Sequence, residues 1–260
     1  MDALSRILTR IRKNTTSVPC KYKCALCKDT GWILEKNAKY QPTAKKCKCQ
    51  LKNENEKQWA TFGIDPASVK SLGEYNTYDE KTSKAKQIIS NYIFNYNKNE
   101  NKKYSWVALL EQPGAGKSHL IQAAGGILIK QNVNCVYMPY TEVIQALKGQ
   151  AAEYEKYMQL LEKFKKAEVL IIDDLFKEKI KNGVLIHDLN EVDSKHIYPL
   201  LNYRYNNNLN TIISSEATPE MLMQLDRALC GRILEKCNNN IIVFKGNQYD
   251  YRLNKFMGRA

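Results

Sequence analysis

The residues between Val107 and Leu120 have the composition of a phosphate-binding loop. An apolar run from Val107 to Leu110 leads into Glu111-Gln112-Pro113-Gly114-Ala115-Gly116-Lys117-Ser118-His119, and an amphipathic stretch follows as far as Lys130. The order strand, loop, helix lets backbone N–H groups and a helix N-terminus surround a phosphate. We therefore expect a nucleoside triphosphate here rather than a chance glycine-rich turn.

Each residue type in this loop has a chemical reason. Glycines at 114 and 116 allow the backbone to wrap the phosphates, Lys117 supplies a positive charge to the β and γ phosphates, and the Ser118 hydroxyl is placed to bind Mg²⁺. The residues predicted to hold the nucleotide in this loop are Gly114, Ala115, Gly116, Lys117, Ser118 and His119. Glu111 stands where the G-x-x-x-x-G-K-[ST] pattern has glycine, which predicts reduced affinity or turnover.

Two later apolar runs end in polar residues that could complete the site. Val169 to Ile172 is followed by Asp173 and Asp174, at the carboxyl end of a strand, where parallel sheets present ligand-binding groups. We expect Asp173 to hold Mg²⁺ and Asp174 to act as general base. The run from Leu209 to Glu216 predicts a γ-phosphate-sensing residue, which we assign to Ser215, with Ser214 and Glu216 left open.

The cysteines near the N-terminus have metal-ligand spacing. Cys24 and Cys27 form a C-x-x-C pair, and Cys47 and Cys49 follow after a gap of 19 residues. Four thiolates from two turns suit a closed, structural zinc site. Cys20 is a fifth candidate that could replace one of them. The eight cysteines of a chain expected to be cytoplasmic favour metal or free thiols over disulfides.

Composition limits the class of protein. The chain has 260 residues, 43% hydrophobic content and a net charge of +13, and residues 1–103 hold 21 of its 40 Lys/Arg but 10 of its 27 Asp/Glu. This excess favours a polyanionic partner, although compositional drift would produce the same balance. We find no apolar run of membrane-spanning length and no signal-peptide core, so we expect a cytoplasmic protein with no membrane partner.

The elements that must position these residues follow from apolar periodicity. We expect a short amphipathic helix over residues 2–12, a helix over 80–96, a strand over 135–138, a long helical region over 142–166 and a final strand over 240–245. The predicted domains are 1–53, a helix and zinc-binding domain; 54–103, a linker and helical lead-in; and 104–260, a nucleotide-binding domain of α/β class.

The motifs together point to a family. They are the cysteine pairs with Gly31-Trp32, the loop Pro113 to Leu120, the run Asp173 to Lys177, Asn202 to Tyr205, Ile213 to Glu216, and Leu229 to Ile233. This succession resembles the AAA+ ATPases of the DnaC/DnaI-type replicative helicase loader family, in the phage or Gram-positive form with an N-terminal zinc-binding domain. The IstB transposition ATPases are related neighbours, but generally lack the cysteine head.

The resemblance implies further properties. The fold would be an AAA+ P-loop domain with a parallel sheet of order 5-1-4-3-2, acting as an oligomer. Arg232 would be the catalytic arginine finger, which reaches a neighbouring subunit's nucleotide, and Arg252 would close on the γ-phosphate of its own subunit. Arg204 would lie at a subunit interface, on DNA, or simply on a helix surface. Many relatives carry Asn or Asp near Ser214 and Ser215.

The function we expect is that of an ATP-dependent loader using ATP, Mg²⁺ and Zn²⁺. It would bind the replicative hexameric helicase through its N-terminal domain, self-associate through its ATPase domain and place the helicase on single-stranded DNA. One alternative is an IstB-like transposition ATPase. Another is a nucleotide-binding factor that captures a helicase with little hydrolysis.

Overall fold

The computed structural model describes residues 22–36, 40–98 and 106–258 and divides the chain into two compact units, residues 1–51 and 52–260. The helix expected over residues 2–12 and Cys20 lie outside the described residues. Among the helices that are described, none has both the length and the apolar character required to cross a membrane.

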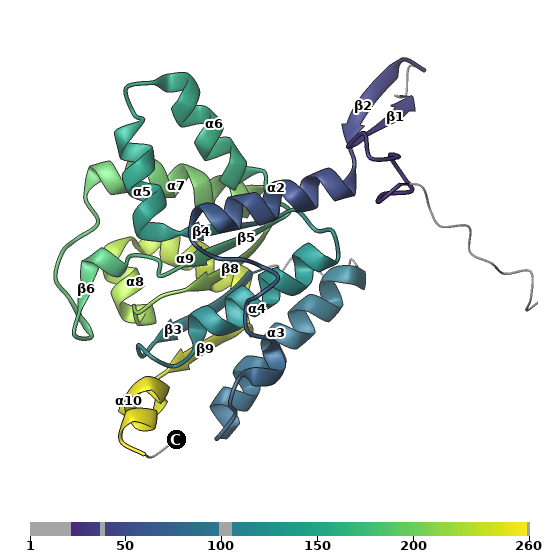
Figure 1. Cartoon of the computed structure of the whole chain (residues 1–260). Helices are drawn as coiled ribbons and strands as arrows, with labels where there is room; N and C mark the ends of the chain where they lie inside the picture. Colours follow the sequence, from purple (N-terminus) through teal and green to yellow (C-terminus); the bar gives the residue numbers. More distant parts are fainter. Residues whose placement is uncertain (1–21, 37–39, 99–105, 259–260) are drawn as a thin grey trace, which may run out of the picture. The chain divides into compact units, whose positions relative to one another are not determined.

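The first unit is built on a hairpin between two cysteine pairs. Strands β1 (Trp32–Lys36) and β2 (Pro42–Lys46) are antiparallel, with Trp32 opposite Lys46. One cysteine pair precedes β1 and the other follows β2 (Figure 1). The hairpin therefore brings residues 20 positions apart in the chain back to one place.

The second unit is organised around a parallel sheet of five strands. These are β3 (Trp106–Glu111), β4 (Cys135–Pro139), β5 (Val169–Asp173), β8 (Asn210–Ser214) and β9 (Ile241–Phe244). Their spatial order is β4-β5-β8-β3-β9, and every neighbouring pair is parallel. Numbered one to five along the chain, this is the order 5-1-4-3-2, so the expected α/β fold is confirmed. The strands are almost continuously apolar because both faces of the sheet are covered.

Helices cover the two faces of this sheet (Figure 1). One face packs against α3 (Glu80–Lys98) and α4 (Lys117–Lys130). The other packs against α5 (Tyr140–Gly149), α6 (Tyr154–Lys165), α7 (Glu191–Asn206), α8 (Pro219–Leu225) and α9 (Arg227–Cys237). A small hairpin of β6 (Ile180–Lys181) and β7 (Val184–Leu185) precedes α7, and α10 (Tyr251–Phe256) follows the last strand. The short 3-10 turns are η1 (Leu72–Glu74), η3 (Lys177–Lys179) and η4 (Asn247–Tyr249).

The helical region expected over residues 142–166 is present, but it consists of two helices. Helix α5 ends at Gly149, a poor helix former, and α6 begins at Tyr154 after a short turn. Each helix has its own apolar face; α6 buries Leu161 and Phe164. The helix expected over residues 80–96 and the strands expected over 135–138 and 240–245 are present as α3, β4 and β9.

Helix α2 (Lys48–Thr61) is the element that the sequence pattern missed. Its buried residues are Asn55, Gln58 and Trp59, of which two are polar. They are buried because they bind the backbone of β4, the strand at one edge of the sheet. The described part of residues 54–103, which we expected to be a linker and lead-in, thus packs within the second unit.

Candidate nucleotide site and metal centre

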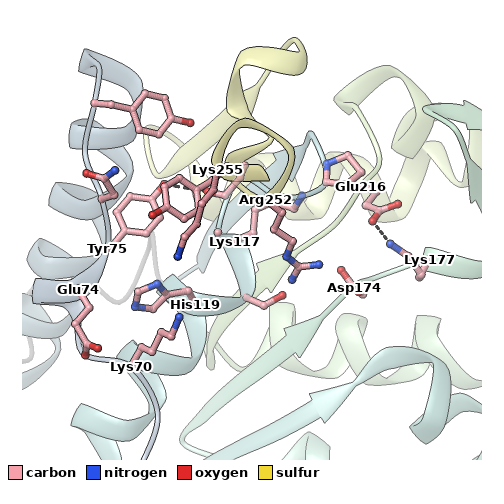
Figure 2. A pocket seen from close by; sticks show the side chains of 18 residues that line it. Lys70, Glu74, Tyr75, Lys117, His119, Asp174, Lys177, Glu216, Arg252 and Lys255 are labelled. Carbon is pink, nitrogen blue, oxygen red and sulfur yellow. Dashed lines mark hydrogen bonds and ion pairs between the residues drawn. The ribbon is translucent and has the colours of Figure 1, made fainter. Parts of the chain in front are cut away.

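A cavity of about 560 Å³ lies over the phosphate-binding loop (Figure 2). Its walls come from four parts of the second unit: the loop from Pro113 to His119; the segment with Lys70, Glu74, Tyr75, Asn76 and Tyr78; the sheet edge with Asp174, Lys177 and Glu216; and the C-terminal Tyr251, Arg252 and Lys255. Cations outnumber carboxylates on these walls, which suits an anionic ligand. Its volume suits a nucleotide-sized molecule.

The loop glycines have the backbone conformations that the motif requires. Gly114 and Gly116 have φ of +81° and +78°, a region that residues with a side chain rarely adopt. A Cβ on Gly114 would lie 2.2 Å from Asp250 Oδ1, and one on Gly116 would lie 2.8 Å from the Tyr75 ring. Both glycines are therefore needed for the close packing of neighbouring segments on the loop as well as for its shape.

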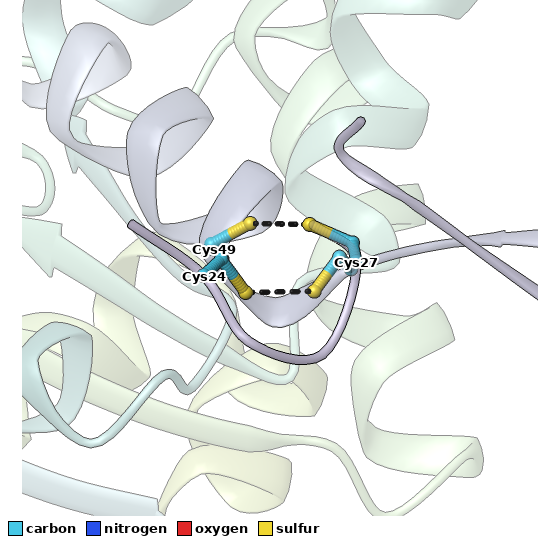
Figure 3. Close-up of side chains that lie close together, drawn as sticks. Cys24, Cys27 and Cys49 are labelled. Carbon is cyan, nitrogen blue, oxygen red and sulfur yellow. Dashed lines mark hydrogen bonds between the residues drawn. The ribbon is translucent and has the colours of Figure 1, made fainter. Parts of the chain in front are cut away.

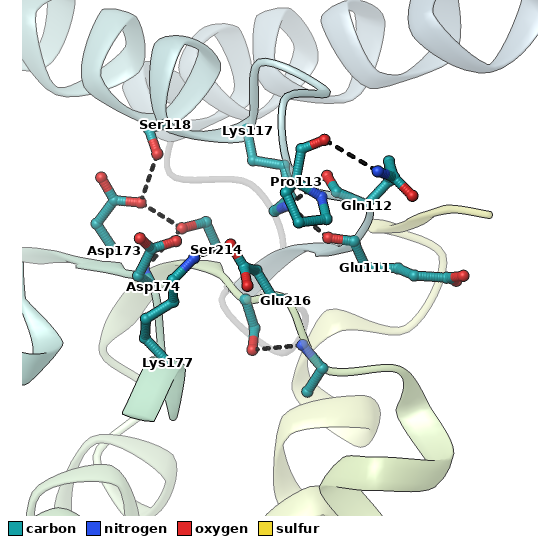
Figure 4. A network of polar contacts seen from close by, with 12 residues as sticks. Glu111, Gln112, Pro113, Lys117, Ser118, Asp173, Asp174, Lys177, Ser214 and Glu216 are labelled. Atoms are coloured by element: carbon teal, nitrogen blue, oxygen red, sulfur yellow. Dashed lines mark hydrogen bonds and ion pairs between the residues drawn. The ribbon is translucent and has the colours of Figure 1, made fainter. Parts of the chain in front are cut away.

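Lys117 is buried at the start of α4 and folded back onto its own loop. Its Nζ donates to the carbonyl oxygens of Glu111 at 2.5 Å and Gln112 at 2.8 Å (Figure 4). Burial lowers the pKa of Lys117 to about 8, and the nearby carboxylate of Asp174 opposes that shift. A bound phosphate would supply the counter-charge that this buried ammonium lacks.

The backbone conformation of Glu111 shows why the loop pattern has glycine at this position. It is the last residue of β3 and has φ of +73°, so the position favours glycine for conformational reasons. Its side chain is not among those that line the cavity. The cost of Glu111 at this position is therefore backbone strain, rather than a carboxylate placed beside the phosphates.

Ser118 and Asp173 come together as a magnesium site requires. Ser118 Oγ donates to Asp173 Oδ1 at 2.9 Å, and the Ser214 hydroxyl donates to the same oxygen (Figure 4). A hydroxyl and a carboxylate beside a triphosphate cradle are the oxygen ligands that Mg²⁺ prefers. The donor set therefore fits the ion.

Asp174 faces the cavity one residue after Asp173. Burial raises the pKa of its carboxyl group, and the charge of Asp173 adds to this effect. Its backbone N–H donates to Ser214 Oγ at 2.9 Å, which fixes the residue at the end of β5. A carboxylate with a raised pKa at the mouth of the loop is suited to accept a proton from water.

The three residues at the end of β8 have separate roles. Ser215, which we assigned to the γ-phosphate, is buried, and its hydroxyl donates to the Leu175 carbonyl oxygen at 2.6 Å. Ser214 binds Asp173, whereas Glu216 lines the cavity and pairs with Lys177 (Figures 2 and 4). The geometry thus directs Ser215 into the protein interior and leaves Glu216 as the residue of the three that faces the ligand.

The predicted arginines have three different environments. Arg252 lines the cavity beside Asp174 (Figure 2). Arg232 is partly exposed on α9, with its guanidinium carbon 5.2 Å and 5.7 Å from the ring centres of Tyr198 and Tyr205, and it does not line the cavity of its own chain. Arg204 is completely buried, so the surface positions expected for it are wrong.

Arg204 instead joins α6 to the sheet. It donates to the carbonyl oxygens of Phe164 and Lys165 in the last turn of α6, and to that of Ala167 just beyond the helix, at 2.9 to 3.0 Å. It also donates to Thr211 Oγ1 and to the Asn210 carbonyl on β8. An arginine in a sequence gives no signal of such burial.

The opposite wall was not predicted. Tyr75 packs on Gly116 and donates through its hydroxyl to the Ala115 carbonyl oxygen at 3.1 Å. His119 Nε2 donates to the Ser71 carbonyl oxygen at 2.9 Å, and its ring contacts that of Tyr75 edge to face. The sequence signal for this wall was weak, because Ser71 and Tyr75 lie in an irregular segment some 40 positions before the loop.

The four cysteines of the first unit form a compact cluster. The Sγ atoms of Cys24, Cys27, Cys47 and Cys49 all lie within 4.8 Å of one another. Cys24 and Cys47 are 3.7 Å apart and Cys27 and Cys49 are 3.5 Å apart (Figure 3). A zinc tetrahedron with bonds of about 2.3 Å has sulfur separations of about 3.8 Å. The cluster therefore fits a zinc site with four thiolate ligands.

The backbone around Cys24 supports a thiolate. The Asp29 carboxylate accepts from the N–H groups of Lys23 at 3.0 Å and Cys24 at 2.8 Å, which closes the first turn. The N–H groups of Cys27 and Leu26 lower the pKa of Cys24 to about 7. Amides directed at sulfur in this way are typical of thiolate metal ligands.

The loop, the acidic strand end and the sheet order can now be compared with known proteins. A family model of the bacterial DnaA ATPase domain matches residues 76–237. The chain belongs to the bacterial DnaA ATPase-domain family. Among curated proteins, it is 32% identical over 244 residues to the phage-like element PBSX protein XkdC of Bacillus subtilis strain 168, covering 92% of this chain and 88% of that protein.

Two solved structures share the fold of this AAA+ domain. The crystal structure of the DnaC helicase loader matches with a TM-score of 0.57 and 21% identity, covering 70% of this chain and 100% of that one. The crystal structure of DnaI matches with a TM-score of 0.52 and 24% identity, covering 69% and 89% respectively. At these identities the two matches show the fold alone, and the fold that the resemblance implied is confirmed.

Proposed function

We propose that this protein is an ATP-dependent loader that binds a replicative hexameric helicase and places it on single-stranded DNA. The observation that carries the proposal is the cavity lined by Lys117, Ser118, Asp174 and Arg252, in which Ser118 is hydrogen-bonded to Asp173, in a chain of this ATPase family. The fold similarity to a helicase loader supports the choice of partner.

The residues of the cavity have distinct roles in this proposal. The N–H groups from Gly114 to His119 hold the phosphates, Lys117 leaves its loop carbonyls to contact them, and Arg252 closes on the γ-phosphate. Ser118 and Asp173 hold Mg²⁺, which would neutralise phosphate charge. Asp174 accepts the proton of the attacking water, and Arg232 of one chain serves the nucleotide of its neighbour. We keep residues 1–53 as the helicase-binding domain and 104–260 as the ATPase domain.

Calorimetry with magnesium ATP tests the nucleotide site. We expect saturable heat with one site per chain for the intact protein and no heat for Lys117→Ala, because the buried cation is lost. Lys130→Ala, at the exposed end of the same helix, is the matched control and should bind like the parent. Absence of heat from the intact protein would remove the ATPase assignment.

Loading is tested with the replicative hexameric helicase of Bacillus subtilis, the organism of the curated relative. We expect the two proteins to elute together, and the helicase to unwind a primer on circular single-stranded DNA only when loader and ATP are present. Unwinding at the same rate without the loader would contradict the proposal.

A helicase-capturing factor with little hydrolysis is the second candidate. The feature that favours it is the attachment of Lys117 to the Glu111 and Gln112 carbonyls, because ATP must break both contacts. Stable binding of helicase together with ATP turnover no faster than the Lys117→Ala background would favour this candidate over the first.

We also propose that Zn²⁺ is the metal of the cysteine cluster. Metal analysis of the purified protein should give one zinc per chain. Cys27→Ser should lose it, because three thiolates hold zinc far more weakly than four, whereas Cys230→Ala, a thiol buried in the second unit, should keep it. A metal-free parent that is still fully folded would exclude a structural zinc.

A further inference from the structure

Helix α2 is attached to the edge of the sheet by three side chains. Asn55 Nδ2 donates to the Val133 carbonyl oxygen at 3.3 Å, Trp59 Nε1 donates to that of Cys135 at 3.1 Å, and Gln58 Nε2 donates to that of Tyr137 at 2.5 Å. Two of the acceptors, Cys135 and Tyr137, are alternate residues of β4, whose carbonyls point toward the same edge of the sheet, and Val133 lies just before the strand. The helix therefore takes the place of a further strand beside β4.

Tyr137 receives the most complete support. The amide of Gln58 binds both backbone groups of Tyr137, because its Oε1 also accepts from the Tyr137 N–H at 3.1 Å. The ring centres of Trp59 and Tyr137 are 5.0 Å apart. The ring of Phe62 meets that of Tyr137 edge to face, with 6.4 Å between the ring centres. With 4% of its surface exposed, Tyr137 has a fixed backbone and a fixed ring.

The hydroxyl of Tyr137 reaches the metal carboxylate. It donates to Asp173 Oδ2 at 2.6 Å and accepts from Gln122 Nε2 at 3.2 Å. The other carboxylate oxygen, Oδ1, is the one that faces Ser118. The two oxygens of Asp173 therefore have different partners: Oδ2 binds Tyr137 in the interior, and Oδ1 binds Ser118, which lines the cavity.

We infer that Tyr137 is a positioning residue for magnesium binding, which orients Asp173 through Oδ2 so that Oδ1 and Ser118 face the ion, and that Gln58 of α2 holds Tyr137 in place. This inference rests on the proposed nucleotide function and adds to it two residues that do not touch the ligand.

The chemistry of the contact favours this role over simple packing. Tyr137 presents a neutral phenolic O–H to Asp173 Oδ2, and this contact is buried. A neutral donor fixes a carboxylate without cancelling its charge, as partners of metal ligands commonly do. A phenylalanine would fill the same space but could not orient Oδ2.

Tyr137→Phe tests the inference through the magnesium dependence of binding. Removal of such a partner typically weakens metal affinity about 10-fold to 100-fold. We therefore expect the magnesium concentration that half-saturates ATP binding to rise at least about tenfold, while ATP binding in EDTA stays unchanged. Tyr96→Phe is the matched control, because it removes a hydroxyl that donates to exposed Glu168 at 3.2 Å, and its magnesium dependence should equal the parent's.

Gln58→Met tests the second half of the inference, since it keeps the side-chain volume but loses both hydrogen bonds. We expect a smaller rise in the required magnesium concentration, in the same direction. If Tyr137→Phe lowers the melting temperature yet leaves the magnesium dependence unchanged, Tyr137 is a packing residue and the inference is overturned. If the parent itself binds no magnesium ATP, the proposed function fails instead.

Discussion

Glu111 departs from the phosphate-loop motif at a position that does not line the cavity. Its φ of +73° is a conformation that costs a residue with a Cβ about 1 to 2 kcal/mol. The chain tolerates this cost at the end of β3, where the backbone must turn into the phosphate loop. We therefore expect Glu111 to affect the free energy of unfolding more than the affinity for nucleotide.

Glu111→Gly should stabilise the protein and leave ATP affinity within about twofold. The relief of strain exceeds the added entropy of the unfolded chain by about 0.5 to 1 kcal/mol, which corresponds to a rise in melting temperature of about 1 to 4 °C. Asn132→Gly, at another non-glycine position with positive φ, should gain less because asparagine adopts this region more readily. A tenfold change in ATP affinity would show that the Glu111 side chain contacts the nucleotide.

His196 gives the protein a defined pH dependence. It is buried, and its Nδ1 lies 3.1 Å from the Tyr157 hydroxyl. Burial lowers the pKa of His196; the positive charge of Lys148 adds to the shift and the carboxylate of Asp193 opposes it. The unfolded chain therefore binds a proton more readily than the folded one.

The free energy of unfolding should therefore have its full contribution from His196 above pH 6.5. It should fall as the pH drops from 6.5 toward the lower pKa of His196 in the folded state. The slope from this group is at most about 1.4 kcal/mol per pH unit. Urea unfolding at a series of pH values should show a shallower fall for His196→Gln, whereas His187→Gln, an exposed histidine, should follow the parent. Identical curves for the parent and His196→Gln would contradict the prediction.

At the scale of elements, Arg204 is the side chain that ties α6 and β8 together. Its hydrogen bonds reach the carbonyl oxygens of Phe164 and Lys165 in the last turn of α6, and that of Ala167 just beyond the helix. Such a network is valuable because each carbonyl would otherwise be buried unpaired.

Arg204→Ala should lower the free energy of unfolding by about 4 kcal/mol, since it breaks a buried hydrogen-bond network. Arg227→Ala, on the exposed first turn of α9, should change it by less than about 0.5 kcal/mol. Both are measured by urea denaturation. If Arg204→Ala has the stability of the parent but fails to bind DNA, Arg204 contacts DNA and the structural role is wrong.

The contrast between α2 and the loop helix α4 shows what the sequence could predict. The phosphate loop and the four clustered cysteines follow from apolar runs and residue spacing, which are local properties, whereas the sheet order was implied by the family resemblance. Helix α2 could not be recognised, because Gln58 is buried to bind a strand backbone, a contact with no apolar periodicity. The positions of Arg204 and Ser215 likewise depend on partners far along the chain.

At the scale of the whole molecule, the role proposed for Arg232 requires a second chain. It lies against the Tyr198 and Tyr205 rings and not in its own cavity. A head-to-tail assembly would bring it to the site of a neighbour.

Mixing two inactive variants tests this arrangement. Lys117→Ala lacks a working site but keeps Arg232, and Arg232→Ala keeps the site but lacks the arginine. In an equal mixture about a quarter of head-to-tail interfaces would combine an intact site with an intact arginine. We expect ATP turnover to reappear on mixing, in proportion to that fraction. No recovery, in a mixture shown by light scattering to assemble, would mean that Arg232 does not serve a neighbour.

The side chains of α2 along β4 have a consequence for any shortened version of this chain. An edge strand with free backbone groups recruits strands from other molecules, and here Asn55, Gln58 and Trp59 occupy the carbonyls at Val133, Cys135 and Tyr137. An ATPase fragment that starts after Thr61 would expose an apolar sheet margin and should precipitate. A fragment that starts before Asn55 should remain dispersed at the same concentration.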